Sequence, residues 1–116
     1  MDRVADFRRR IDDIDEQLVK LLNVRASIAL EIGRIKHANN EPIYQPGREA
    51  EVLAHVRESN KGPLDEGAVT RLFERIIDEA RRLERLADQI RAIESKAATD
   101  VADKAATRVA DKDRGE

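Results

Sequence analysis

Two basic residues, Arg25 and Lys36, lie on what would otherwise be an apolar helix face. Arg25 stands where the regular spacing of apolar residues calls for another apolar side chain. A guanidinium among apolar side chains is costly unless it has an anionic partner. Lys36 lies eleven residues after Arg25, so on a helix it would share nearly the same face, about 16 Å along the axis. Two cations placed in this way could bracket a small dianion. A structural ion pair between Arg25 and a helix Glu is the alternative interpretation.

The stretch that would position these cations runs from Val4 to Lys36. It contains no proline and only one glycine, Gly33, so we expect one helix of about 33 residues and roughly 50 Å. A helix of that length cannot bury its apolar face inside one compact monomer, so the sequence predicts a second copy of the chain as its partner. The apolar face recurs at steps of three and four residues, and its members are Val4, Phe7, Ile11, Ile14, Leu18, Leu21, Ile28, Ile32 and Ile35.

Four further charged residues could take part in the same chemistry. Arg8 lies about 25 Å from Arg25 along the predicted helix, too far to reach the same small ligand within one chain. In an antiparallel pair, Arg8 of one copy could reach the site of the other. Arg48 and Glu49 open a second helix, and Glu84 borders the apolar face of a third. Each of these positions would also suit an ordinary flanking residue or a partner of the helix dipole.

Breaker clusters divide the rest of the chain into two more helices. Residues 39–42, Asn-Asn-Glu-Pro, would end the first helix, because Asn tolerates the left-handed conformation and Pro cannot continue a helix. A second helix is expected over about residues 46–59, and Asp65 is a suitable N-cap for a third. The apolar pattern of the third helix fades near Ile93. We therefore predict an all-α domain of three helices over residues 1–95.

The segment 96–116 differs from the domain before it. It contains an eight-residue unit twice, KAATDVAD and KAATRVAD, with Val101 and Val109 as the only large apolar residues. A period of eight fits neither the heptad nor the eleven-residue repeat of coiled coils. We expect a solvated extension that is disordered or weakly helical, and we assign it no chemistry.

The composition limits the classes of function. Of the 116 residues, 40% are charged and 3% aromatic, which suits long amphipathic helices with a modest aliphatic core. The net charge of −2 gives no general attraction to nucleic acid or to an anionic membrane. There is no cysteine for thiolate chemistry, and no stretch is long and apolar enough to span a bilayer. We expect a soluble cytoplasmic protein.

Taken together, these residues resemble the all-helical class of chorismate mutase over about Phe7 to Arg85. The spacing is specific: from one Arg, seventeen residues to a second Arg, eleven to a Lys and twelve to an Arg-Glu pair. The chain is also similar to the mutase-type domain that some bacteria fuse to DAHP synthase, which makes such a synthase a candidate partner. The matching segments are RRRIDDIDEQLVKLLNVR, EIGRIK, YQPGRE and TRLFERIIDEARRLE.

The resemblance implies an intertwined homodimer with two active sites that convert chorismate to prephenate, on the way to phenylalanine and tyrosine. It implies that Arg25, together with Arg8 of the partner chain, holds the two substrate carboxylates. Lys36 would contact the ether oxygen and a carboxylate, Arg48 would support the carboxylate end, and Glu49 would accept from the ring hydroxyl. A [3,3] rearrangement needs no metal or redox cofactor; it needs orientation and fixed charges near the ether oxygen.

Three positions depart from the best-known enteric pattern of that family. Gln45 replaces an Asp near the ring hydroxyl and can still bond a hydroxyl. Ala80 replaces a Ser on the third helix and offers no side-chain group to a carboxylate. Glu84 replaces a Gln that donates to the ether oxygen, so Glu84 would need a proton to donate there.

Two alternatives remain open at this point. An isochorismate-pyruvate lyase on the same fold would use the same cations to eliminate pyruvate. A non-catalytic helical module for regulation or docking, for example of a DAHP synthase, belongs to a different class. The set of inward cations argues against docking alone, because a docking surface has no need of them.

Overall fold

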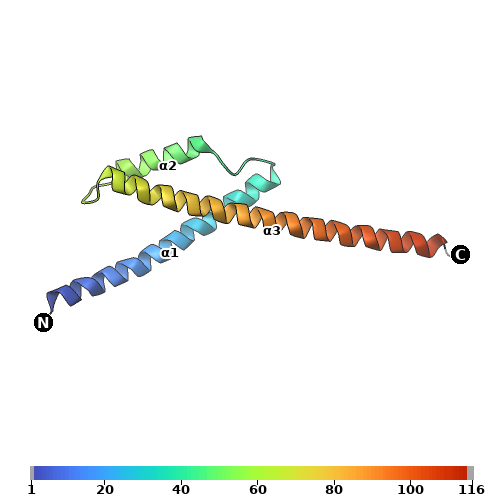
Figure 1. Cartoon of the computed structure of the whole chain (residues 1–116), viewed down its shortest axis with the longest axis horizontal. Coiled ribbons are helices and arrows are strands. Elements are labelled where there is room, and N and C mark those ends of the chain that lie inside the picture. The colour runs from blue at the N-terminus through green and yellow to red at the C-terminus, as the bar shows by residue number, and fades with distance from the viewer. Residues whose placement is uncertain (1, 115–116) are drawn as a thin grey trace.

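A computed structural model describes residues 2–114, and three helices make up nearly all of that range. α1 spans Arg3–Ala38, α2 spans Pro46–Ser59 and α3 spans Glu66–Arg114. Figure 1 shows α1 and α3 crossing, with α2 alongside the first part of α3. The predicted all-α fold with a very long first helix is confirmed. None of the helices within these residues is long and apolar enough to cross a membrane.

Local sequence sets the ends of the helices. The Asp2 side chain caps α1 by accepting a hydrogen bond from the backbone N–H of Val4 at 3.0 Å. Just after α1, Asn40 takes a φ of 56°, the left-handed conformation that Asn tolerates. Asp65 caps α3, accepting from a backbone N–H of the first turn at 2.7 Å. Asn40 and Asp65 are the breaker and the cap that the sequence predicts.

The three helices cover one another only in part. The extents are 88 × 39 × 15 Å and the radius of gyration is 23.4 Å, whereas a compact chain of this length would have about 13 Å. Among the described residues, Val69 is the one buried hydrophobic side chain. The apolar residues of α1 between Val4 and Leu21 that form the predicted stripe are 50–64% exposed. Half of α1 therefore presents an apolar face that no other part of the described chain covers.

α3 continues well beyond the point where its apolar pattern fades. The helix extends to Arg114, and its second half runs out alone from the crossing in Figure 1. All side chains over residues 92–106 are exposed. The Ala-rich composition explains why a helix persists here without packing, because alanine has the highest helix propensity. The division of the chain near residue 95 stays a prediction.

Candidate functional site

A cavity of about 380 Å³ lies where α1, α2 and α3 meet. This volume is in the range of small-molecule sites, roughly 300–1,000 Å³. Its wall combines aliphatic side chains from all three helices with charged groups. Seven of the eight predicted site residues line it, namely Arg25, Lys36, Gln45, Arg48, Glu49, Ala80 and Glu84.

The crossing of α1 and α3 depends on Gly33, the buried residue of α1. A Cβ added at Gly33 would lie 3.3 Å from Cγ of Glu84, which is closer than an ordinary van der Waals contact. The missing side chain therefore lets α3 bring Glu84 directly against α1, one turn before Lys36. The sequence marks Gly33 as the one glycine of the predicted helix, but only the structure gives the reason.

Arg25 and Lys36 bring positive charge to the cavity and form no ion pair with another described side chain. Both side chains are half-buried. Among the side chains that the structure describes, no carboxylate lies within ion-pair distance of either one. Lys36 Nζ donates to the backbone carbonyl of Ile43 at 3.5 Å, a long hydrogen bond. The structural ion pair considered for Arg25 is thus absent from the described residues, and both cations remain available to an anion.

The α2 side of the cavity carries Gln45, Arg48 and Glu49. Gln45 is the N-cap residue of α2, and its side chain makes no capping hydrogen bond, so its amide is available to a ligand. Arg48 pairs with Glu51 at 3.3 Å on the exposed side of the helix. Such exposed pairs are weak, so an anion in the cavity could compete for Arg48. The carboxylate of Glu49 is more buried and is held by a residue of α3, described below.

Glu84 is a cavity carboxyl whose surroundings strengthen its hold on a proton. Burial raises the pKa of its carboxyl above the ordinary value; the nearby Lys36 ammonium lowers it and Asp88 raises it, and the net shift is upward. Asp88 is itself held at 3.3 Å from Nδ1 of His37 and at 2.7 Å from Arg91. Glu84 thus keeps its proton to a higher pH than an exposed Glu does, and a protonated carboxyl can donate a hydrogen bond into the cavity.

Arg81 lines the same cavity and was not predicted from the sequence. Its Nη2 lies 2.9 Å from Oε1 of Glu49 and 2.9 Å from Oδ1 of Asp78. Its guanidinium carbon lies 4.7 Å from the centre of the Tyr44 ring. The sequence does contain one clue to Arg81: a residue three positions before Glu84 lies near it on the same side of a helix, so Arg81 could be expected close to the site. Glu49 and Tyr44, however, come from other elements, and their contacts with Arg81 could not be read from that spacing.

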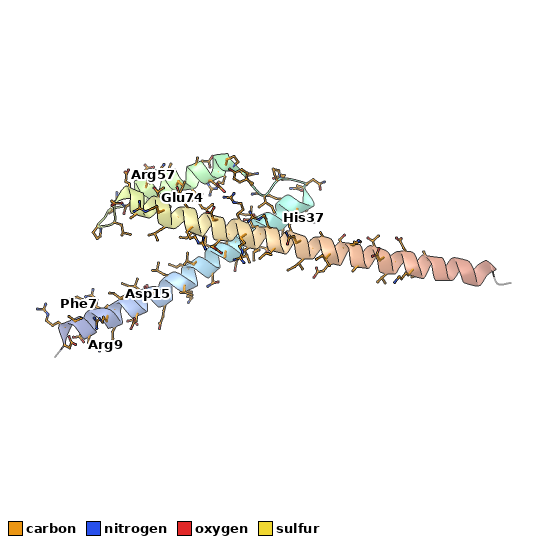
Figure 2. The ribbon with its side chains drawn as sticks, in the orientation of Figure 1. Phe7, Arg9, Asp15, His37, Arg57 and Glu74 are labelled. Carbon is orange, nitrogen blue, oxygen red and sulfur yellow. The ribbon has the colours of Figure 1, made fainter. Side chains whose placement is uncertain are left out.

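Arg8 does not line the cavity. Its neighbours Phe7 and Arg9 are labelled in Figure 2 at the free end of α1, far from the crossing of α1 and α3. A sequence separation of seventeen residues puts Arg8 about 25 Å from Arg25 along a continuous helix. Within one chain, Arg8 is therefore outside the site.

The sequence profile of the family described as chorismate mutase type II matches residues 7–85, more than half of the chain. The chain belongs to the type II chorismate mutase family. The matched range includes every residue of the cavity described above. It ends at Arg85, so the second half of α3 lies outside it.

The curated relatives of this chain include bifunctional proteins and also a protein from Methanocaldococcus jannaschii named simply chorismate mutase. The bifunctional chorismate mutase/prephenate dehydratase of Stutzerimonas stutzeri is 41% identical over 88 residues, covering 72% of this chain and 24% of that protein. The chain thus spans about a quarter of the length of that curated relative.

Two solved structures of this family share the fold. Chorismate mutase form II from Thermus thermophilus is 31% identical with a TM-score of 0.71, over 72% of this chain and 96% of that one. Chorismate mutase from Helicobacter pylori in complex with prephenate is 30% identical with a TM-score of 0.69, over 74% and 93%. The described residues of this chain contain no group of three or more His, Asp or Glu side chains placed to hold a metal ion.

Proposed function

We propose that the chain is a chorismate mutase, which converts chorismate to prephenate by a [3,3] rearrangement. In this reaction the C–O ether bond breaks and a C–C bond forms within one molecule. The observation that carries the proposal is the cavity, where Arg25 and Lys36 lack carboxylate partners in the described structure and Glu84 has a raised pKa. That set suits a dianionic substrate whose ether oxygen gains negative charge during the reaction.

Each side chain has a defined part in this proposal. Arg25 binds one carboxylate of the substrate, and Arg48 supports the carboxylate end from the start of α2. Lys36 contacts the ether oxygen and a carboxylate, and a protonated Glu84 donates to the same ether oxygen as its charge grows. The reaction needs the two reacting ends of the substrate to be held together, which fixed groups lining one cavity achieve.

The remaining two polar groups, Gln45 and Glu49, face the ring hydroxyl in this proposal. The amide of Gln45 can donate to or accept from a hydroxyl, and the carboxylate of Glu49 accepts from it. Ala80 contributes only a wall, because its methyl group forms no hydrogen bond.

The proposal includes a homodimer with shared sites. The exposed apolar stripe of α1 between Val4 and Leu21 supports it, since monomers rarely expose a continuous apolar surface of this length. Arg8 supports it as well, because a second copy of α1 running antiparallel could bring the partner's Arg8 to the cavity. A DAHP synthase partner and a cytoplasmic location stay predictions.

The test is the loss of chorismate absorbance on adding the purified protein. We expect turnover by the wild type and a fall of about 100-fold or more in Lys36→Ala, as for other groups that stabilise a developing oxyanion. Lys20→Ala, on an exposed part of α1, is the matched control and should match the wild type. Faster turnover of isochorismate than of chorismate would indicate the lyase, and no turnover of either would indicate a non-catalytic module.

A further inference from the structure

Arg81 joins three segments of the chain at one point. It belongs to α3, it pairs with Glu49 of α2 at 2.9 Å, and its guanidinium lies over Tyr44 in the α1–α2 connection at 4.7 Å. The Arg81 side chain is 26% exposed and that of Glu49 is 27% exposed, so the pair is partly shielded from water. A partly buried charge pair is worth more than an exposed one and fixes the geometry of both groups.

The next residue, Arg82, provides the contrast. Its side chain is 68% exposed and reaches only Glu79 of the same helix, at 3.7 Å. Among the side chains that the structure describes, every other ion pair of an Arg joins residues three or four apart in one helix. The Arg81–Glu49 pair is thus the one described Arg pair that ties two helices together, and it does so at the cavity wall.

We propose that Arg81 is a positioning residue for recognition of the substrate's ring hydroxyl, acting through Glu49 and Tyr44. This inference rests on the proposed function. The ion pair uses Oε1 of Glu49, which leaves Oε2 to accept a hydrogen bond from the hydroxyl. Tyr44 directly precedes Gln45, so the cation–π contact also restrains the segment that carries the second hydroxyl partner.

Recognition of the hydroxyl acts on the bound substrate as well as on the transition state, because the hydroxyl is not a reacting group. Loss of an interaction that both states share raises KM and leaves kcat nearly unchanged. Without Arg81 the Glu49 carboxylate can turn toward solvent. We therefore expect Arg81→Met, which keeps the alkyl stem and removes the charge, to lower kcat/KM roughly tenfold, mostly through KM.

A double-mutant cycle separates action through Glu49 from a general effect on folding. The five proteins compared are the wild type, Arg81→Met, Glu49→Gln, the double variant, and Arg82→Met as the matched control. Once Glu49 is changed, adding Arg81→Met should lower kcat/KM by clearly less than the tenfold expected in the wild-type background, because only the contact with Tyr44 is then left to lose. Arg82→Met should behave as the wild type. An Arg81→Met that matches Arg82→Met, or losses that multiply in the double variant, would overturn the inference.

Two further measurements keep the test decisive. If Arg81→Met does not fold, Arg81→Lys decides: it keeps the charge but loses the planar face over Tyr44, so KM should rise several-fold, and an unchanged KM overturns the inference. If the wild type has no mutase activity, the proposed function fails, and calorimetric binding of prephenate then tests Arg81 alone. Binding about tenfold weaker in Arg81→Met than in Arg82→Met supports its role; equal binding, or no binding even by the wild type, overturns it.

Discussion

Two helical arms leave the crossing of α1 and α3, and they differ in what they expose (Figure 1). The first half of α1 carries a continuous stripe of large aliphatic and aromatic side chains, each at least half exposed. The arm of α3 beyond residue 95 carries Val101, 67% exposed, as the only large apolar residue among its described side chains. Both are regular helices, so secondary structure alone does not distinguish them.

The difference indicates which arm needs a partner. Burying apolar area stabilises by roughly 25 cal/mol per Å², so a stripe of six large side chains offers a strong driving force for association. The α3 arm offers almost none. We therefore place the proposed dimer contact, and the arginine that a partner chain would contribute to the site, on the α1 arm, and we expect the α3 arm to be dispensable for both.

The largest expected effect tests the α1 arm. Arg8→Ala and Lys36→Ala should each lose activity by about 100-fold or more, because each removes a cation from the charged site. If the sites are shared, an equal mixture that re-forms dimers should regain about a quarter of the wild-type activity. Half of the dimers are then heterodimers, and each of these has one site with both defects and one with neither.

The control for this experiment lies beside Arg8. Arg9 pairs with Asp6 of its own helix, so Arg9→Ala should keep its activity. Heterodimer formation is checked independently with differently tagged chains. Heterodimers that form but stay inactive would show that each site is built from one chain.

The next effect concerns Glu84 at the crossing. Its raised pKa keeps the donor form present to higher pH, and activity should fall as pH rises through that pKa. Glu84→Gln is a permanent donor of nearly the same shape, so it should flatten the alkaline limb of the kcat profile and keep substantial activity. Glu84→Ala should lose most activity at every pH.

The pH dependence of the free energy of unfolding gives a second way to detect the raised pKa of Glu84. The folded chain holds the Glu84 proton more tightly than the unfolded chain does, because burial raises the folded-state pKa. Between the ordinary and the raised pKa the folded state binds more protons, so the free energy of unfolding decreases as pH rises through that window. Glu84→Gln should remove this component of the pH dependence. A wild-type rate that is flat from mildly acidic to alkaline pH would exclude Glu84 as the donor.

A smaller effect is expected at the contact that places Glu84. Gly33→Ala puts a methyl group 3.3 Å from Cγ of Glu84, so the Glu84 side chain must shift. We expect kcat to fall by roughly three- to tenfold, while Tm changes little because alanine's helix propensity, about 1 kcal/mol better than glycine's, offsets the crowding. Gly47→Ala is the control, since nothing lies within 4 Å of its added Cβ. Equal activity of the two variants would show that the close approach at Gly33 does not matter for catalysis.

The sequence predicts more of this molecule than long-range contacts would usually allow, because most of its features are local. Helix ends depend on residues close to them in the chain, namely the caps Asp2 and Asp65 and the turn at Asn40. Such ends can therefore be predicted from the residue types near them. The helical period also places Arg25 and Lys36 on one face. Those residues line one cavity because the helices cross where that face is turned inward.

What could not be predicted depends on contacts between elements. Arg81 and its neighbour Arg82 look alike in the sequence, and only the approach of Glu49 and Tyr44 from other segments distinguishes them. The reason for Gly33 lies fifty-one residues away at Glu84. The end of α3 is a further case, because the sequence allows either disorder or weak helicity after residue 95: the apolar period ends near Ile93, but helix propensity, which needs no period, continues.

The smallest effect is expected from the α3 arm. Deleting residues 96–116 should leave mutase activity unchanged and Tm within about 2 °C, because the described side chains of this arm are all exposed and little apolar area is lost.

Deleting residues 86–116 is the informative contrast. It also removes Asp88, whose carboxylate lies 3.3 Å from His37 of α1, together with the half-exposed Leu86. We expect this longer deletion to lower Tm by several degrees and to weaken the crossing that carries Glu84. A similar loss from the shorter deletion would show that the α3 arm is packed in the assembled protein and that the contrast between the two arms is wrong.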